Sequence, residues 1–97
     1  RWNTWIGRML EDPRFAARVK ERFAFFDAQR PQIKQNIQKW AEDLQFAQAE
    51  NDSIWQTIGE YVWPNPVVYD TYEEEVTHLS DWLDARMDWM ADSVEQL

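Results

Sequence analysis

Glu75 and His78 come closest in this sequence to a pair of metal ligands, because they lie three residues apart on a predicted helix. Glu-x-x-His places a carboxylate and an imidazole on one helix face and forms one arm of a di-iron carboxylate site. Such a site needs a second arm, and His78 is the single histidine of the 97 residues. We therefore expect no metal centre in this chain.

A stripe of arginines raises the possibility of a phosphate-binding face. Arg14, Arg18 and Arg22 recur every four residues, with Lys20 nearby. Nucleic-acid affinity depends mainly on contacts between Lys or Arg and phosphates. The net charge is -8, and residues 40–97 carry fourteen Asp and Glu against one Arg, so this half opposes the approach of a polyanion. We expect no nucleic-acid partner.

Other catalytic signatures are missing from the sequence. The absence of cysteine excludes disulfides, thiolate zinc sites and cysteine nucleophiles. No glycine-rich phosphate loop, no nucleophile elbow and no Ser/His/Asp set is present. We expect no catalytic residue and no cofactor-binding residue in this chain.

The stretch GEYVWPNPVVYDTY at residues 59–72 is the constellation with a real binding alternative. Exposed aromatic rings stack on sugars or on proline-rich peptides, whereas buried rings close the end of a helical bundle. The second interpretation is favoured. The candidate interface or anchor residues are Trp55, Tyr61, Trp63 and Tyr69.

We call residues 59–71 the strap, and its prolines predict an extended conformation. Each proline biases the residue before it toward extended geometry. In an extended chain Trp63, Val67 and Tyr69 fall on one side, so Trp63 is expected to be a buried anchor over the end of the core. Truncating such a ring costs about 3–5 kcal/mol.

The remaining sequence patterns as helix, and two glycines are too few for a β-sandwich or barrel. We expect an all-α fold of three main helices plus short helices, joined by the strap. A weak helix over residues 3–11, with Trp2 and Trp5 on its apolar side, precedes a second helix that begins at Asp12-Pro13, a carboxylate N-cap followed by proline at N1.

Pro31 repeats the start signal for a third helix, which we expect to run to about Glu50, with one further turn at residues 54–58. Its predicted inner stripe contains Ile33, Ile37, Trp40, Leu44 and Ala47. Thr71 and Glu74 form a capping box that starts the last helix.

Length predicts one domain over residues 1–97, and seven tryptophans favour a tryptophan-rich core. Residues 1–39 carry nine Lys and Arg against four Asp and Glu, the reverse of the acidic remainder. We expect the basic second helix to lie beside the acidic last helix, because opposite charges attract.

Three stretches stand out, and they are LEDPRFAARVKERF at residues 10–23, GEYVWPNP at residues 59–66 and TYEEEVTHLSDWLDARMDWM at residues 71–90. Together they resemble the C-terminal part of the CotH kinase-like family, the spore-coat-protein-H type of atypical protein kinase. The order DPRF, AEND, WPNP and then WL-x-x-R-x-x-WM is a distinctive series, although none of these is a catalytic motif.

The resemblance implies that an ATP-binding, kinase-like region precedes this segment in the same polypeptide and carries the phosphate- and metal-binding residues. The start RWNTW agrees with a fragment or mature portion of something longer. The segment is then a non-catalytic helical subdomain that supports that region. The alternative is a stand-alone helical module that binds protein or glycan through the strap.

The sequence and the family resemblance also bear on membrane contact and on location. No apolar run approaches the roughly 20 residues that span a bilayer, so no membrane span is expected. Family analogy favours an extracytoplasmic or cell-envelope location, with the spore coat as the alternative.

Overall fold

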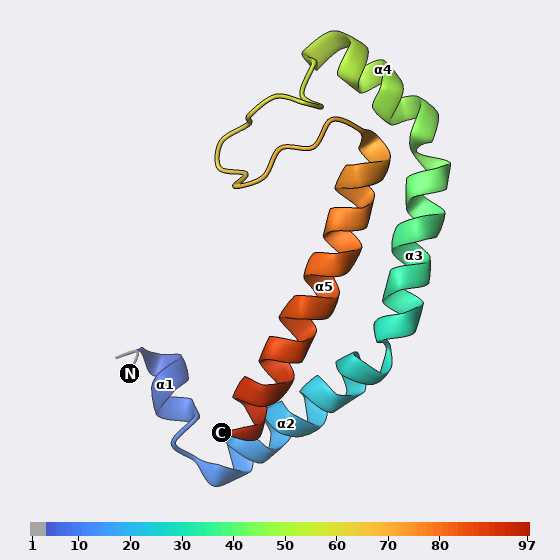
Figure 1. Cartoon of the computed structure of the whole chain (residues 1–97). Coiled ribbons are helices and arrows are strands. Elements are labelled where there is room, and N and C mark those ends of the chain that lie inside the picture. The colour runs from blue at the N-terminus through green and yellow to red at the C-terminus, as the bar shows by residue number, and fades with distance from the viewer. Residues whose placement is uncertain (1–3) are drawn as a thin grey trace. The chain divides into compact units, whose positions relative to one another are not determined.

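The computed structural model describes residues 4–97, which form five helices and no strand (Figure 1). The helices are α1 (Trp5–Met9), α2 (Pro13–Ala28), α3 (Arg30–Asp43), α4 (Gln45–Trp55) and α5 (Tyr72–Glu95). The predicted all-α fold is confirmed, with α2, α3 and α5 as its main helices. Trp2 and Asn3, which the sequence assigned to the first helix region, lie outside the described residues.

The chain divides into two compact units. Unit 1 contains the described residues up to Pro31 together with Asp84–Leu97, and unit 2 contains Gln32–Leu83. The continuous helix α5 gives its first half to unit 2 and its second half to unit 1. That residues 1–97 act as one domain stays a prediction.

Both predicted helix starts are made by the residues that the sequence indicated. Asp12 accepts a hydrogen bond from the backbone N–H of Arg14 at 2.9 Å, with Pro13 at the first helical position. Thr71 Oγ1 accepts from the N–H of Glu74 at 3.1 Å. The carboxylate of Glu74 reaches back to the N–H of Asp70 at 3.2 Å, one residue earlier than in a standard capping box.

In unit 1 the second helix lies beside the second half of α5, as predicted. Lys20 Nζ of α2 donates to the backbone carbonyl of Glu95 at 3.1 Å. Arg30, the first residue of α3, joins the two helices because it bonds Asp27 of α2 and also donates through Nη1 to Asp88 of α5 at 2.8 Å. Ala16 of α2 and Met87 of α5 are the buried hydrophobic residues among those described. The arginine stripe does not make this contact, because Arg14 and Arg18 pair with nearby acids on the exposed side of α2.

In unit 2 the third helix differs from the prediction. It ends at Asp43, and α4 then runs through Asp52 and Ser53 to Trp55. The sequence predicted that the helix would end near Glu50, before these polar side chains. Instead, Ser53 Oγ donates to the carbonyl of Glu50 at 2.7 Å within the helix, and Asp52 caps the end of α4 by accepting from the N–H of Thr57 at 2.8 Å.

The predicted tryptophan-rich core is wrong. Each tryptophan in the described part of the chain has more than half of its surface exposed, and no side chain there is less than 2% exposed. One reason is visible at Trp89, whose ring lies under the guanidinium of Arg86 at 4.5 Å on the outside of α5. The exposed tryptophans are Trp5, Trp40, Trp55, Trp63, Trp82 and Trp89.

Over residues 4–97, no helix combines the length and the apolar character needed to cross a membrane.

Candidate functional site

The ends of the strap are held together by backbone hydrogen bonds in unit 2. The N–H of Gly59 donates to the carbonyl of Tyr69 at 2.9 Å, and Gly59 adopts a φ of 84°, a conformation that glycine tolerates best. Just before it, Asp52 Oδ1 accepts from the N–H groups of Thr57 at 2.8 Å and Ile58 at 2.9 Å. The strap is therefore a closed loop with a fixed base (Figure 1).

The tip of the strap is a turn and not an extended run. The N–H of Asn65 donates to the carbonyl of Val62 at 2.8 Å, so Trp63 and Pro64 occupy the corner of this turn. The peptide bond between them is cis. A corner residue projects away from the loop, and the Trp63 side chain is 80% exposed. The prediction that Trp63 is a buried anchor is wrong, because the turn ends the alternation that an extended strap would have kept.

Tyr69 is the half-buried ring among the four candidates, and it faces the first turns of α5. Its hydroxyl lies 3.3 Å from Nδ1 of His78, and the two ring centroids are 5.3 Å apart. Nearby, the hydroxyl of Tyr72 donates to the carbonyl of Ala41 at 3.0 Å, which joins the start of α5 to α3. These two tyrosines fix the base of the strap to the helices of unit 2.

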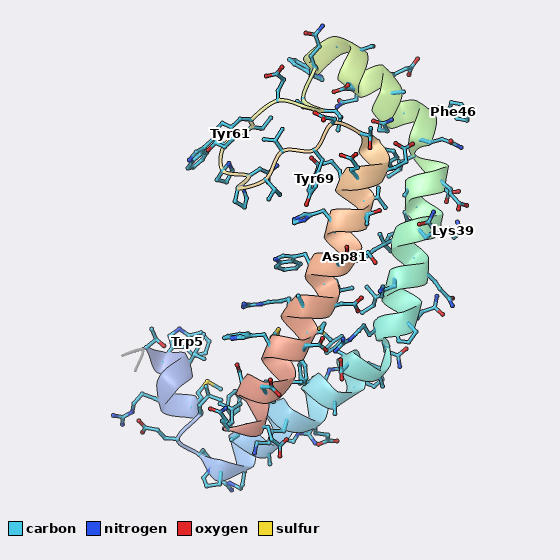
Figure 2. All side chains as sticks on the ribbon, viewed as in Figure 1. Trp5, Lys39, Phe46, Tyr61, Tyr69 and Asp81 are labelled. Carbon is cyan, nitrogen blue, oxygen red and sulfur yellow. The ribbon has the colours of Figure 1, made fainter. Side chains whose placement is uncertain are left out.

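The other three candidates stay apart from Tyr69. Tyr61 is 64% exposed and points away from the helices at the outer side of the strap (Figure 2). Trp55 is exposed at the last residue of α4. Among the described residues, no ring contact joins any two of the four candidates. The structure therefore presents separate aromatic side chains, with Tyr61 and Trp63 on the same loop.

An open hollow of about 410 Å³ lies where α4, the strap and α5 meet. Asp52, Asp70 and Glu73 make its charge negative, so it opposes phosphates and other anions. The oxygen of Asp52 that caps α4 is already occupied by backbone N–H groups. Residues that line the hollow include Gln48, Asp52, Ile58, Asp70, Tyr72 and Glu73.

Ligands for a metal do not converge in this part of the chain. Within residues 4–97, no group of three His, Cys, Asp or Glu side chains is placed to hold an ion. His78, half of the Glu-x-x-His pair, lies against Tyr69 instead. What unit 2 does present is exposed apolar surface, which includes Tyr61 and Trp63 on the strap and Phe46 and Ile54 on α4.

The outward side of α4 was missed by the sequence analysis. Phe46 is 79% exposed and Ile54 is 69% exposed, whereas the polar residues Gln48 and Asp52 are half-buried. The signal was present in the spacing, because Gln48 and Asp52 share one side of a helix and Phe46 and Ile54 lie on the other. The sequence analysis instead assigned one inner stripe to a single long helix, through Leu44 and Ala47, and so did not identify this side of α4.

Comparison with protein-family models gave a match over most of the chain. The family model described as CotH kinase protein matches residues 1–90. Comparisons with curated proteins and with solved structures gave no match. The family match covers α1 to α4, the strap and most of α5.

Proposed function

Because this chain belongs to the CotH kinase family, whose model matches residues 1–90, we propose that it is a non-catalytic helical subdomain. It packs against and supports a kinase-like region that precedes it in the same polypeptide. Its contribution is stability and shape, and the phosphotransfer chemistry belongs to the preceding region. We call residues 1–97 joined to that region the full polypeptide.

The observation that carries this proposal is the distribution of apolar surface. In residues 4–97, Ala16 and Met87 are buried, while eighteen large hydrophobic side chains are exposed. Folding must offset about 1–2 kcal/mol of backbone entropy for each ordered residue, and burial of apolar area is the main favourable term. Large exposed apolar patches are typical of surfaces that another protein surface covers. A covering region in the same polypeptide accounts for this excess.

The non-catalytic part of the proposal rests on the residues present. Transfer of a phosphoryl group needs a cradle for the phosphates and carboxylates that hold Mg²⁺. Neither of the two glycines belongs to a phosphate loop. We expect isothermal titration calorimetry of residues 1–97 with Mg-ATP to show no saturable binding. Micromolar binding to this segment would contradict the assignment.

The supporting role is tested by deletion. The full polypeptide and a version that lacks residues 1–97 are compared by thermal unfolding of the kinase-like region. We expect the deletion to lower the unfolding temperature of that region, because it exposes the apolar surface that the helices cover. An unchanged temperature would show that the two parts are independent and would overturn the proposal.

A second candidate function is supported by the exposure of the strap. Trp63 and Tyr61 lie on a loop whose base is fixed, so little loop entropy is lost when a ligand stacks on them. On this alternative the strap binds a protein or a glycan. Titration of neutral oligosaccharides and of a proline-rich peptide into wild-type and Trp63→Ala proteins tests it. The alternative requires binding that this substitution abolishes, with Phe25→Ala as the control on another exposed ring.

Location is also proposed by family analogy. We place the protein outside the cytoplasm or in the cell envelope, with the spore coat as the alternative. Fractionation of cells that express the full polypeptide with an epitope tag distinguishes these locations.

A further inference from the structure

Helix α4 of unit 2 turns polar side chains toward the rest of the unit and large apolar side chains toward solvent. Its half-buried residues include the polar pair Gln48 and Asp52, which face the strap and the start of α5. Its large apolar residues Phe46 and Ile54 face solvent. A helix on a finished surface shows the opposite arrangement. The outward side of α4 is therefore a candidate binding surface.

Three residues define this outward side, and we call them the α4 face. Phe46, Glu50 and Ile54 are spaced by four residues, which places them in one row along the helix. All three are exposed, and Phe46 projects on the side away from the strap (Figure 2). Its two apolar side chains, Phe46 and Ile54, lie two turns apart on one side of the helix, an arrangement that suits a helix lying in the groove of a partner.

The polar side of α4 faces the base of the strap. Asp52 accepts hydrogen bonds from the N–H groups of Thr57 and Ile58, and Gln48 lines the same hollow beside the strap. Phe46 and Ile54 lie on the opposite side of the helix and are exposed. The α4 face stays outward in unit 2 and is available for a partner.

Charge restricts what that partner is. Residues 32–83 carry two lysines and ten Asp or Glu, a net charge of -8, and α4 itself contains no Lys or Arg. A second copy of unit 2 is repelled by this charge, because like charges facing each other oppose association. A surface with Lys or Arg at its edges is attracted to Glu50 and to the acids around it.

We propose that the α4 face docks in an apolar groove edged by Lys or Arg on the preceding kinase-like region of the full polypeptide. This inference rests on the proposed function and names the surface through which unit 2 performs it. Phe46 and Ile54 fill the groove, and Glu50 pairs with a basic residue at its edge. The contact is one helix in one groove.

Hydroxyl-radical footprinting of the full polypeptide tests the docking at the level of single side chains. We expect Phe46 to be oxidised at least about tenfold more slowly in the native protein than after unfolding in denaturant, because tenfold protection corresponds to about 1.4 kcal/mol of docking free energy. Tyr61, which is also exposed in unit 2 but lies outside the α4 face, is the control and should react readily. Oxidation of Phe46 close to its unfolded rate would overturn the proposal.

Substitutions on the α4 face supply a second measurement. Ile54→Ser should restore the oxidation of Phe46 in the full polypeptide, and Tyr61→Ser should not. Glu50→Lys should raise Phe46 oxidation more than Glu50→Gln, because the reversed charge meets the basic edge of the groove. Phe46 protection that survives both Ile54→Ser and Glu50→Lys would contradict the proposal.

Two further outcomes have defined meanings. Protection of Phe46 that disappears on dilution would show that a second copy covers the α4 face, which contradicts the proposal. If deletion of residues 1–97 destabilises the kinase-like region while Phe46 stays reactive, the proposed function holds and this inference fails. If the deletion has no effect, the proposed function itself fails.

Discussion

Arg30 Nη1 donates a hydrogen bond of 2.8 Å to Asp88 of α5, a residue 58 positions later in the sequence. The same guanidinium bonds Asp27 through Nε at 3.0 Å and Nη2 at 2.6 Å, and it lies 3.7 Å from Asp84. The Arg30 side chain is 19% exposed. Its hydrogen bonds to Asp88 and then to Asp27 raise the pKa of Arg30. One arginine thus holds α2 and the second half of α5 together in unit 1.

The first prediction concerns this cluster. Arg30→Ala should lower the unfolding temperature of the full polypeptide, because three carboxylates lose the cation that they share. Arg30→Lys should restore only part of the loss, since a single ammonium cannot reproduce the planar fork. Arg14→Ala is the control, because its pair with Asp12 is local and the Arg14 side chain is 92% exposed. Equal effects of Arg30→Ala and Arg14→Ala on the unfolding temperature would contradict this assignment.

The second prediction concerns the small core of unit 1. Met87 is 8% exposed, so Met87→Ala should lower the free energy of unfolding by about 2–5 kcal/mol, the range for buried Leu, Ile or Met. Met9→Ala is the matched control, because Met9 is 39% exposed. Chemical denaturation of the two variants measures the difference. A smaller loss for Met87→Ala than for Met9→Ala would place the core elsewhere.

Local signals made the helices predictable. Asp12-Pro13 and Thr71-x-x-Glu74 determine helix starts through bonds between residues a few positions apart. The meeting of α2 and α5 was also predicted, from the opposite charges of the two segments, although Lys20 bonds a backbone carbonyl there and the arginine stripe takes no part.

The candidate site was less predictable because it depends on contacts that spacing does not encode. Trp63 is exposed because Asn65 bonds Val62 and closes a turn, whereas proline content alone indicated an extended run. Phe46 faces solvent, while Asp52 on the opposite side of α4 accepts hydrogen bonds at the end of the helix. Hydrophobic periodicity does not predict hydrogen bonds of this kind between neighbouring residues of a loop.

The third prediction follows from the corrected position of Trp63. Trp63→Ala should change the free energy of unfolding of residues 1–97 by no more than about 0.5 kcal/mol, as exposed substitutions do. Tyr69→Ala should cost more, because that ring is half-buried against His78. Urea denaturation of both variants gives the comparison. A loss of about 3–5 kcal/mol for Trp63→Ala would show that the ring is buried.

The fourth prediction is a pH dependence at the start of α2. The side chain of Arg14, and then its backbone N–H, lower the pKa of Asp12 below its usual value of 3.8. The unfolded state therefore takes up the proton at a higher pH than the folded state does. The stability from Asp12 is complete above about pH 4 and is lost as the pH falls through the lower folded pKa.

Asp12→Asn tests this dependence because asparagine is also an accepted N-cap residue and keeps no charge. The difference in unfolding free energy between wild type and Asp12→Asn should be present at pH 7 and should vanish below the folded pKa. Glu11→Gln, one residue earlier, is the control. A difference that stays constant from pH 7 to about pH 2 would rule out the lowered pKa as its source.

In the proposed function, residues 1–97 support the kinase-like region and are expected to fold with it as one cooperative unit. Native-state hydrogen exchange of the full polypeptide at increasing denaturant measures this directly. We predict that the slowest amides of α5 and those of the kinase-like core exchange with the same free energy and the same denaturant dependence. Amides of α5 that exchange with a separate, lower free energy, unchanged when the kinase-like region is removed, would contradict the account.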